Sequence, residues 1–182
     1  MSKDAPVLRT RQLVPHGSGP GDLASCMAFM TSPRSRHIGG PVGEVKTFRR
    51  FATIFGHWRL RGGGPLIPGL SGTAESIGPA GWLRLPDWPG PEVMWQIWPD
   101  RYEDKGWVAK AAAAARAHMR NAWGLSNLIS LIATGNAHSE GLALRHGAYQ
   151  DARFRTEDGS KIRIWRHPFT EEPDGVLSRR AA

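Results

Sequence analysis

Residues 92–146 constrain the fold more than any other part of the chain. Residues 92–98 (EVMWQIW) form an apolar run between two prolines and predict a central strand. A polar loop follows, and then a helix, a buried strand and a second helix are expected over residues 106–122, 127–133 and 136–146. This dense strand–loop–helix–strand–helix passage predicts a sheet with helices packed against it.

The rest of the chain adds short strands and two helices. Further strands are expected over residues 7–16, 65–70, 77–85, 149–156 and 161–165, and helices over residues 23–30 and 43–60. In the longer helix, the residues that roughly keep the 3.6-residue period are Val45, Phe48, Ala52, Phe55 and Leu60. The order of elements favours an α+β fold with a mixed sheet over a regular βαβ alternation. Residues 31–41 are expected to form a loop, and residues 169–182 a polar tail.

Composition limits the class of protein. The chain has 182 residues, of which 40% are apolar, enough for one domain with a full core. It has no apolar run of about 18 residues and no signal-peptide pattern, which favours a soluble cytoplasmic protein without membrane association. Cys26 is the single cysteine, so an intrachain disulfide is excluded. The seven histidines are scattered without the spacing of metal ligands, so a metal site is not expected.

The formal net charge of +8 calls for an anionic partner or a solvated basic surface. Nucleic acid is one such partner, and a small polyanion is another. Because the sequence shows no basic stripe with interleaved aromatic residues, nucleic acid is the less favoured of the two.

A candidate anion site lies where the loop after residue 98 meets the next helix. Helix N-termini present free backbone N–H groups that suit a pyrophosphate. Gly106 would let the backbone approach such a ligand closely, and Lys105 adds a positive charge. Lys110 lies in the first helical turn, where a cation is unfavourable unless an anion lies nearby. Many strand–loop–helix units bind nothing, so these features alone leave the site open.

The helix that begins after Asn136 gives a second candidate element. Asn136 and Ser139 open this helix, and Gly147 follows its end. Asparagine is a good N-cap and glycine a good C-cap, so capping alone would explain both residues.

Four stretches together resemble a known family. They are VLRTRQLVP (residues 7–15), RHIGGPVGEVKTFRRFATIFGHWRLRGGG (36–64), PEVMWQIWPDRYEDKGWVAKAAAAARAHM (91–119) and LISLIATGNAHSEGLALRHGA (128–148). Over residues 7–168 the chain is similar to the GCN5-related N-acetyltransferases (GNAT), in the branch that includes bacterial ribosomal-protein N-terminal acetyltransferases. The resemblance implies one GNAT domain over residues 5–168, a twisted mixed sheet whose fourth and fifth strands splay apart, and acetyl-coenzyme A bound in the resulting V.

The resemblance also assigns cofactor-binding residues. The pantetheine arm would pair with the strand residues Trp95, Gln96, Ile97 and Trp98. The pyrophosphate would meet the loop residues Asp104, Lys105, Gly106, Trp107 and Val108. Asn136 and Ser139 would contact the cofactor arm from the far side of the cleft, and no metal is implied.

Three residues depart from the family pattern in the pyrophosphate loop. Glu103 replaces a neutral or basic residue, and we expect it to weaken cofactor binding by charge repulsion. Val108 replaces a small residue and would crowd the backbone approach, while Lys110 stands where this branch usually has glutamate. These departures support an alternative reading, a degenerate GNAT module that binds an acyl-CoA or a protein partner without turnover.

GNAT chemistry is direct attack of a neutral amine on the thioester, and the resemblance suggests which residues assist it. Glu92 is the first candidate for the general base, with His37 and His57 as alternatives. Ser139 or a water would protonate the leaving thiolate, because residues 136–146 contain no tyrosine. A backbone N–H near Gln96 or Ile97 would polarise the carbonyl.

The amine acceptor, a protein N-terminus or a small molecule, would meet the first loop and the second helix. The expected contacts are His37, Trp58 and Trp82, with Arg34, Arg36 and Trp88 beside them. The sequence leaves both a monomer and a homodimer open.

Overall fold

One mixed sheet organises the protein. The structure, a computed structural model, describes residues 13–70, 75–156 and 159–168. Within these ranges seven strands pair in the order β1-β2-β3-β4-β5-β7-β6. Their bounds are β1 Leu13–Gly17, β2 Leu66–Leu70, β3 Ala80–Leu83, β4 Glu92–Trp95, β5 Leu128–Ala133, β6 Tyr149–Arg155 and β7 Lys161–His167.

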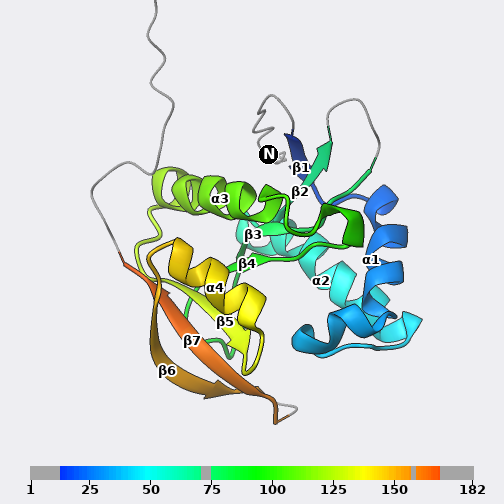
Figure 1. Cartoon of the computed structure of the whole chain (residues 1–182). Coiled ribbons are helices and arrows are strands. Elements are labelled where there is room, and N and C mark those ends of the chain that lie inside the picture. The colour runs from blue at the N-terminus through cyan, green and yellow to red at the C-terminus, as the bar shows by residue number, and fades with distance from the viewer. Residues whose placement is uncertain (1–12, 71–74, 157–158, 169–182) are drawn as a thin grey trace, which may run out of the picture.

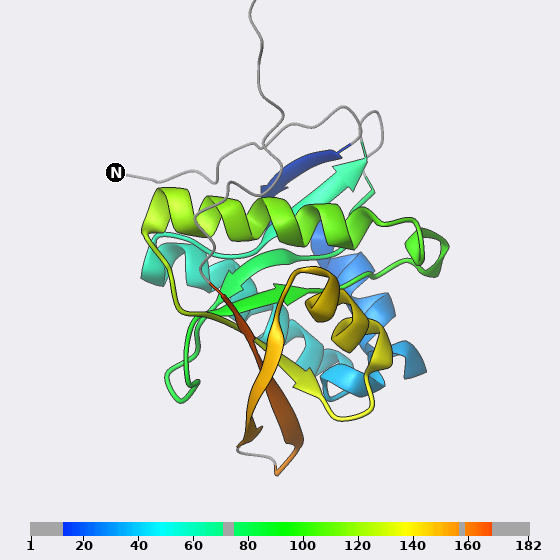
Figure 2. The same ribbon diagram turned by 60° about the vertical axis from the view of Figure 1, so that its left-hand side comes forward.

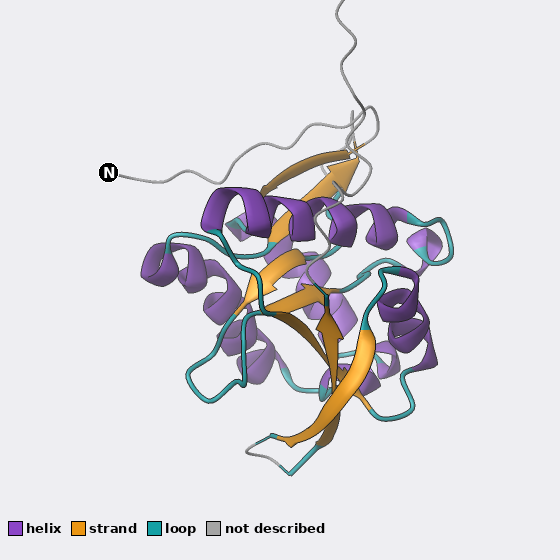
Figure 3. Cartoon of the chain, turned by 90° about the vertical axis from the view of Figure 1, so that its left-hand side faces the viewer, coloured by secondary structure: helices purple, strands orange, loops and turns teal. Residues whose placement is uncertain are grey.

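Helices cover both faces of this sheet (Figures 1 and 3). The α-helices are α1 Leu23–Met30, α2 Glu44–Arg61, α3 Trp107–Trp123 and α4 Ala137–Arg145. Short 3₁₀ turns are η1 Pro20–Asp22, η2 Pro33–Ile38 and η3 Asp100–Tyr102. On β5, Leu128 packs with α3 and Ile132 with α4, so these two helices share a face because alternate strand residues point the same way. Helix α2 lies behind the sheet in the view of Figure 1, and α1 packs against α2 at the right.

The sheet opens between its two central strands. Strand β4 runs parallel to β5, and the two form a single residue pair, Glu92 with Ile129. Beyond that pair their ribbons diverge, which is visible in Figure 2, where the two arrows point in different directions. On its other edge β4 keeps a regular antiparallel ladder of four residue pairs with β3. The expected splay of the fourth and fifth strands is therefore confirmed.

Strand β4 is shorter than expected, because it ends at Trp95 instead of residue 98. The chain beyond it still bonds to the segment before β3, through Gln96 N–H to Pro79 O at 2.9 Å and Trp98 N–H to Ile77 O at 2.8 Å. Gly78 breaks the regular ladder there with a φ of 134°. A Cβ on Gly78 would lie 2.4 Å from the Gln96 carbonyl oxygen, so this close crossing requires glycine.

The other predicted elements are found with small shifts at their ends, and two differences stand out. The expected loop over residues 31–41 contains the 3₁₀ turn η2. Helix α2 buries Thr47, Phe51, Ile54 and His57 instead of the residues whose spacing predicted it. Those residues, among them Val45, Phe48, Phe55 and Leu60, are exposed. Residues 7–12 of the expected first strand and the expected tail over residues 169–182 lie outside the described residues.

Candidate active site

A cavity of about 430 Å³ occupies the opening between β4 and β5. Its walls include Glu92, Val93, Met94, Trp95 and Gln96 from one side, and Ser130, Leu131, Ile132 and Ala133 from the other. Two strands that separate leave backbone groups without ladder partners, and such groups must find others or face a ligand. The cavity is therefore the place where a ligand can pair with strand backbone.

Glu92 lies at the point where the strands separate. The Glu92 side chain is buried, and its Oε1 accepts a hydrogen bond from the backbone N–H of Leu131 at 3.1 Å. In a continuous ladder the Leu131 N–H would donate to a backbone carbonyl of the neighbouring strand. Here it donates to the Glu92 side chain instead. Burial raises the pKa of Glu92 to about 8, against the opposing effect of the Leu131 N–H. A carboxyl group with such a pKa gains and loses its proton near neutral pH.

Ser130 holds the other side of the same opening. Its hydroxyl donates to the carbonyl oxygen of Val93 at 2.7 Å and lies 2.9 Å from His167 Nε2. The other ring nitrogen of His167 lies 3.4 Å from Arg116 Nη1. This arrangement fits a neutral His167 that carries its proton on Nε2 and accepts from Arg116 through Nδ1. The buried chain connects β4, β5, β7 and α3 behind the cavity.

The start of α4 faces the end of β4. Asn136 Oδ1 accepts the Ser139 N–H at 3.2 Å, which is the expected N-cap, and both residues line the cavity. The Ser139 hydroxyl in turn accepts a hydrogen bond from Trp95 Nε1 at 3.3 Å. The structure therefore brings three of the predicted residues, Trp95, Asn136 and Ser139, to one wall of the cavity.

Backbone direction decides which strand amides face the opening. Gln96 N–H is bonded to Pro79, on the β3 side, so it is not available to a ligand. Successive N–H groups of a strand point to opposite edges, so the Trp95 N–H points toward the opening. The Ile97 N–H points the same way, because Gln96 and Trp98 on either side of it both donate to the β3 side. Of the two amides near which an oxyanion contact was expected, Gln96 is thus excluded.

Trp98 is a correction to the predicted cofactor contacts. Its side chain is 3% exposed and packs with Cys26, Phe29, Met30, Phe51 and Ile67. Its N–H donates to Ile77 O, and its carbonyl oxygen accepts from Arg34. Trp98, the last residue of the apolar run that predicted a cavity-facing strand, is therefore a core residue.

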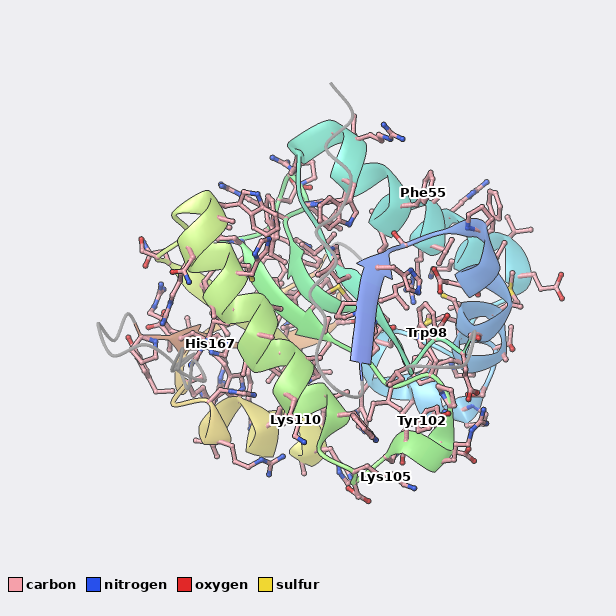
Figure 4. All side chains as sticks on the ribbon, turned by 90° about the horizontal axis from the view of Figure 1, so that it is seen from above. Phe55, Trp98, Tyr102, Lys105, Lys110 and His167 are labelled. Atoms are coloured by element: carbon pink, nitrogen blue, oxygen red, sulfur yellow. The ribbon has the colours of Figure 1, made fainter. Side chains whose placement is uncertain are left out.

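The loop before α3 presents uncapped backbone amides. Asp104 has a φ of 55° and Gly106 a φ of 70°, and no side chain caps the N-terminus of α3. Lys105 and Lys110 are exposed, and Figure 4 shows them at the same end of the molecule as Tyr102. An uncapped helix start with two cations beside it suits an anion, so the anion site stays a prediction.

Glu103 has a partner that the sequence did not reveal. The Arg34 guanidinium forms an ion pair with the Glu103 carboxylate and also donates to the carbonyl oxygens of Ile97 and Trp98. The negative charge in the loop is therefore balanced locally, which weakens the expected repulsion of a phosphate. Arg34 consequently holds the loop and is not free to contact an acceptor, as its position in the first loop had suggested.

Val108 was expected to crowd the backbone approach of the ligand, but its side chain faces the sheet. It lies beside Pro68, Ile77, Gly78 and Ala111, around a gap too small to hold a water molecule. Val108 thus lies on the face of α3 that covers the sheet.

The acceptor contacts predicted from the sequence are only partly found. His37 and Trp88 line the cavity, at the end formed by η2 and the β3–β4 connection. Trp58 does not, because its Nε1 donates to Pro65 O at 2.8 Å and its ring lies against Trp123. Trp82 is also wrong as an acceptor contact, since it is 8% exposed and packs in the core. A tryptophan side chain near a site can serve packing as well as binding, so the presence of several tryptophans did not identify the acceptor contacts.

His57 is excluded as a general base. Its Nδ1 lies 2.6 Å from Gly63 O, and its Nε2 accepts the N–H of Arg84 at 3.1 Å. Burial lowers the pKa of His57, so the ring is neutral and joins the end of α2 to β3.

Some residues of the cavity were not predicted from the sequence. They are Arg50, Thr53 and Ile54 of α2, with Leu83 at the end of β3 and Leu85 after it. A signal did exist, because Phe51 and Ile54 define a second apolar face of α2, narrower than the one the sequence emphasised.

The part of the chain that the structure describes holds no group of three or more metal-ligating side chains. Nor does any helix in those residues have the length and apolarity to cross a bilayer.

Comparison with known proteins decides the family. A family description of the acetyltransferase (GNAT) domain matches residues 14–149. The chain belongs to the GNAT acetyltransferase family. An acetyltransferase from Agrobacterium tumefaciens has a similar structure, with a TM-score of 0.80 and 30% identity over 88% of this chain and 93% of that one. No curated protein matches the chain.

Two more distant structures share the GNAT fold. The ribosomal-protein-S5-alanine acetyltransferase from Vibrio fischeri superposes with a TM-score of 0.64, at 12% identity over 87% of this chain and 94% of that one. RimL, a ribosomal L7/L12 α-N-protein acetyltransferase solved with coenzyme A, gives a TM-score of 0.66 at 11% identity over 90% and 96%. These likenesses confirm the GNAT fold that the resemblance implied.

Proposed function

We propose that this GNAT protein is an acetyl-CoA-dependent N-acetyltransferase that acts on the α-amine of a protein or peptide, or on a small amine. The observation that carries the proposal is the cavity at the separation of β4 and β5. It has the buried carboxyl group of Glu92 on one wall, and the pairing of β4 with the β3 side directs the Trp95 N–H toward it. A coenzyme A complex of a protein with the same fold supports the choice of cofactor, and ribosomal-protein acetyltransferases among the neighbours support a protein N-terminus as acceptor.

The residues that would hold the cofactor fit it in three places. The uncapped amides of Gly106 and Trp107 at the start of α3, with Lys105 beside them, would bind the pyrophosphate. The outward carbonyl oxygen of Trp95 and the outward N–H of Ile97 would pair with the amides of the pantetheine arm, which leaves the Trp95 N–H for the thioester. Asn136 and Ser139 would border that arm from α4. The thioester supplies the acetyl group and a thiolate leaving group.

The chemistry requires three contributions from the chain. Glu92 would accept a proton from the acceptor ammonium, directly or through water, so that the neutral amine can attack the thioester carbonyl. The Trp95 N–H would donate to the oxyanion that develops as the C–N bond forms. The C–S bond then breaks, and the Ser139 hydroxyl or a water would return a proton to the sulfur.

The test measures release of free thiol from acetyl-CoA with a panel of peptide N-termini and small amines. We expect Glu92→Gln to lower kcat by about 10²–10⁴-fold, the usual contribution of a general base, while leaving affinity for acetyl-CoA near its original value. Titration of the protein with coenzyme A by calorimetry provides the control for cofactor binding. Tight binding without thiol release on any amine would favour the non-catalytic alternative. Absence of binding would exclude the enzyme and leave only a module that binds a protein partner.

A further inference from the structure

The acceptor end of the cavity carries an excess of positive charge. It is bounded by η2, by α2 and by the segment after β3. Among the described residues that line the cavity, Glu92 is the only carboxylate, and it is buried at the separation of the strands. The lining cations are Arg36 of η2 and Arg50 of α2, and His37 of η2 also lines the cavity.

Arg50 is held in place by backbone. Its Nη1 donates to the carbonyl oxygen of Ile38 at 3.0 Å, which ties the guanidinium to the end of η2. Gly39 follows with a φ of 77°, and a Cβ at this glycine would lie only 3.0 Å from Arg50 Nη2. The missing side chain therefore makes room for the guanidinium. An arginine that is half-buried and fixed in this way loses little conformational entropy when it binds a ligand.

A cationic acceptor alone would meet repulsion at this end. An ammonium that approaches Arg36 and Arg50 has no lining carboxylate to balance it except Glu92, which must accept its proton. A carboxylate on the same acceptor molecule would pair with the arginine fork, since guanidinium and carboxylate match in geometry and charge. The positive surroundings would also favour the neutral form of the amine, which is the form that attacks.

We propose that the acceptor is an amine that carries a carboxylate a few bonds from the reacting nitrogen, recognised by Arg50 with help from Arg36. This inference rests on the proposed acetyltransferase function and specifies its substrate class. Two sources offer this chemistry: a free amino acid, and a peptide N-terminus with an acidic residue in its first positions. The apolar side chains Ile54, Leu83 and Leu85 at the same end accommodate the rest of either molecule.

Matched acceptors test the proposal on the full-length protein with acetyl-CoA. One pair is two peptide amides that differ only by aspartate or asparagine at the second position, and another is free alanine and alanine amide. We expect kcat/KM to favour the carboxylate member of at least one pair by about tenfold or more, a difference that corresponds to one charge-assisted contact. The pair that shows the preference identifies the source.

Variants then assign the preference to the arginines. Arg50→Gln should remove most of the preference for the carboxylate acceptor, and Arg36→Gln should remove part of it. The KM for acetyl-CoA should stay within about twofold of its original value, because neither arginine is proposed to contact the cofactor. Arg61→Gln is the matched control, because Arg61 is exposed on the same helix outside the cavity lining. A preference that survives in both variants overturns the proposal, as does an effect on the KM for acetyl-CoA alone, which would place these arginines at the cofactor.

Binding covers the case in which no acceptor is turned over. Both acceptor pairs are titrated into the protein saturated with coenzyme A, by calorimetry. Stronger binding of the carboxylate member of either pair, lost in Arg50→Gln, supports the proposal, and equal or undetectable binding within both pairs overturns it. Failure of coenzyme A itself to bind is a separate result, and it would contradict the proposed function.

Discussion

The Arg34 guanidinium lies 3.1 Å from the Glu103 carboxylate, measured from Nε to Oε1, across 69 positions of sequence. Arg34 belongs to η2, which borders the acceptor end of the cavity, and Glu103 belongs to the loop that leads into α3. The pair therefore connects the segments expected to contact the two substrates. Because Arg34 also donates to Ile97 O, it fixes the loop at two places.

Loss of Arg34 should weaken cofactor binding. In Arg34→Gln the Glu103 carboxylate stands uncompensated near the anion site, so we expect the Kd for coenzyme A to rise about three- to tenfold, in the range of a charge-assisted contact. Glu103→Gln should leave the Kd unchanged or lower it, because it removes the negative charge and keeps the loop's bond to Arg34. Calorimetric titrations at low and high salt check both. Equal weakening by the two variants would mean that the pair acts only by holding the loop's shape.

Turnover should rise with pH as Glu92 loses its proton. Since burial raises the pKa of Glu92 to about 8, kcat should increase through that region, and Glu92→Gln should lose this inflection. The pH profile of thiol release with one acceptor, in both proteins, provides the comparison. An identical inflection in Glu92→Gln would assign it to the amine of the acceptor.

The same carboxyl group should make folding stability depend on pH. Its pKa is higher in the folded protein than the ordinary value of 4.5, so its stabilising contribution is complete below pH 4.5 and is lost as pH rises through about 8. Glu92→Gln, which keeps a side chain of the same size, should therefore gain stability relative to the natural protein between pH 5 and 9. Urea denaturation at several pH values measures the difference. Parallel stability profiles for the two proteins would contradict the assigned burial effect.

Ser130→Ala should destabilise the protein. The substitution leaves the Val93 carbonyl and His167 Nε2 without their shared hydroxyl in a buried place, at a cost of about 1–3 kcal/mol. Ser126→Ala, at an exposed position just before β5, is the control and should be close to neutral. Chemical denaturation compares the two variants, and an equal effect would show that the hydroxyl of Ser130 contributes nothing.

Acid should destabilise the fold through His57. Burial holds the pKa of His57 below its ordinary value of 6.5, so the contribution of the neutral ring is present above pH 6.5 and is lost as pH falls below it. His57→Gln should be less stable at neutral pH but should lose less stability on acidification. His138→Gln, at an exposed histidine, is expected to follow the natural protein. Thermal denaturation between pH 5 and 8 tests this difference in slope.

The two faces of α2 should respond differently to substitution. Phe51→Ala removes a buried ring and should cost about 3–5 kcal/mol. Phe48→Ala removes a ring that is 57% exposed and should change stability by less than about 1 kcal/mol. Figure 4 shows Phe55, on the same exposed side, pointing away from the sheet. Comparable losses in both variants would mean that the exposed face is covered in solution.

Local patterns predicted the fold well because each depends on neighbours in sequence. The apolar run of β5 and the cap at Asn136 needed no distant partner, and both are present. The face of α2 was mistaken because its exposed stripe is as regular as its buried one, and only the sheet decides between them. Trp98 was misplaced because an apolar residue after a strand fits a cavity wall and a core equally well.

The site was predictable only where one element supplies it. Gly106 and Ser139 follow from helix starts, which are visible in sequence. The Arg34–Glu103 ion pair and the hydrogen bond from Arg50 to Ile38 join different elements of the fold. The spacing of residues in the sequence does not predict which elements come into contact. Residues that tune a site through tertiary contacts are therefore the ones that sequence patterns miss.

The contact between Glu92 and the Leu131 amide has a kinetic consequence. That amide already has a bonding partner with no other molecule present, so the two strands do not close over the space between them. A ligand entering there displaces solvent and breaks no interstrand ladder. The association rate of the ligand should therefore contain no step in which the two strands separate. The Leu131 amide proton should exchange with deuterated water equally slowly before and after the ligand binds.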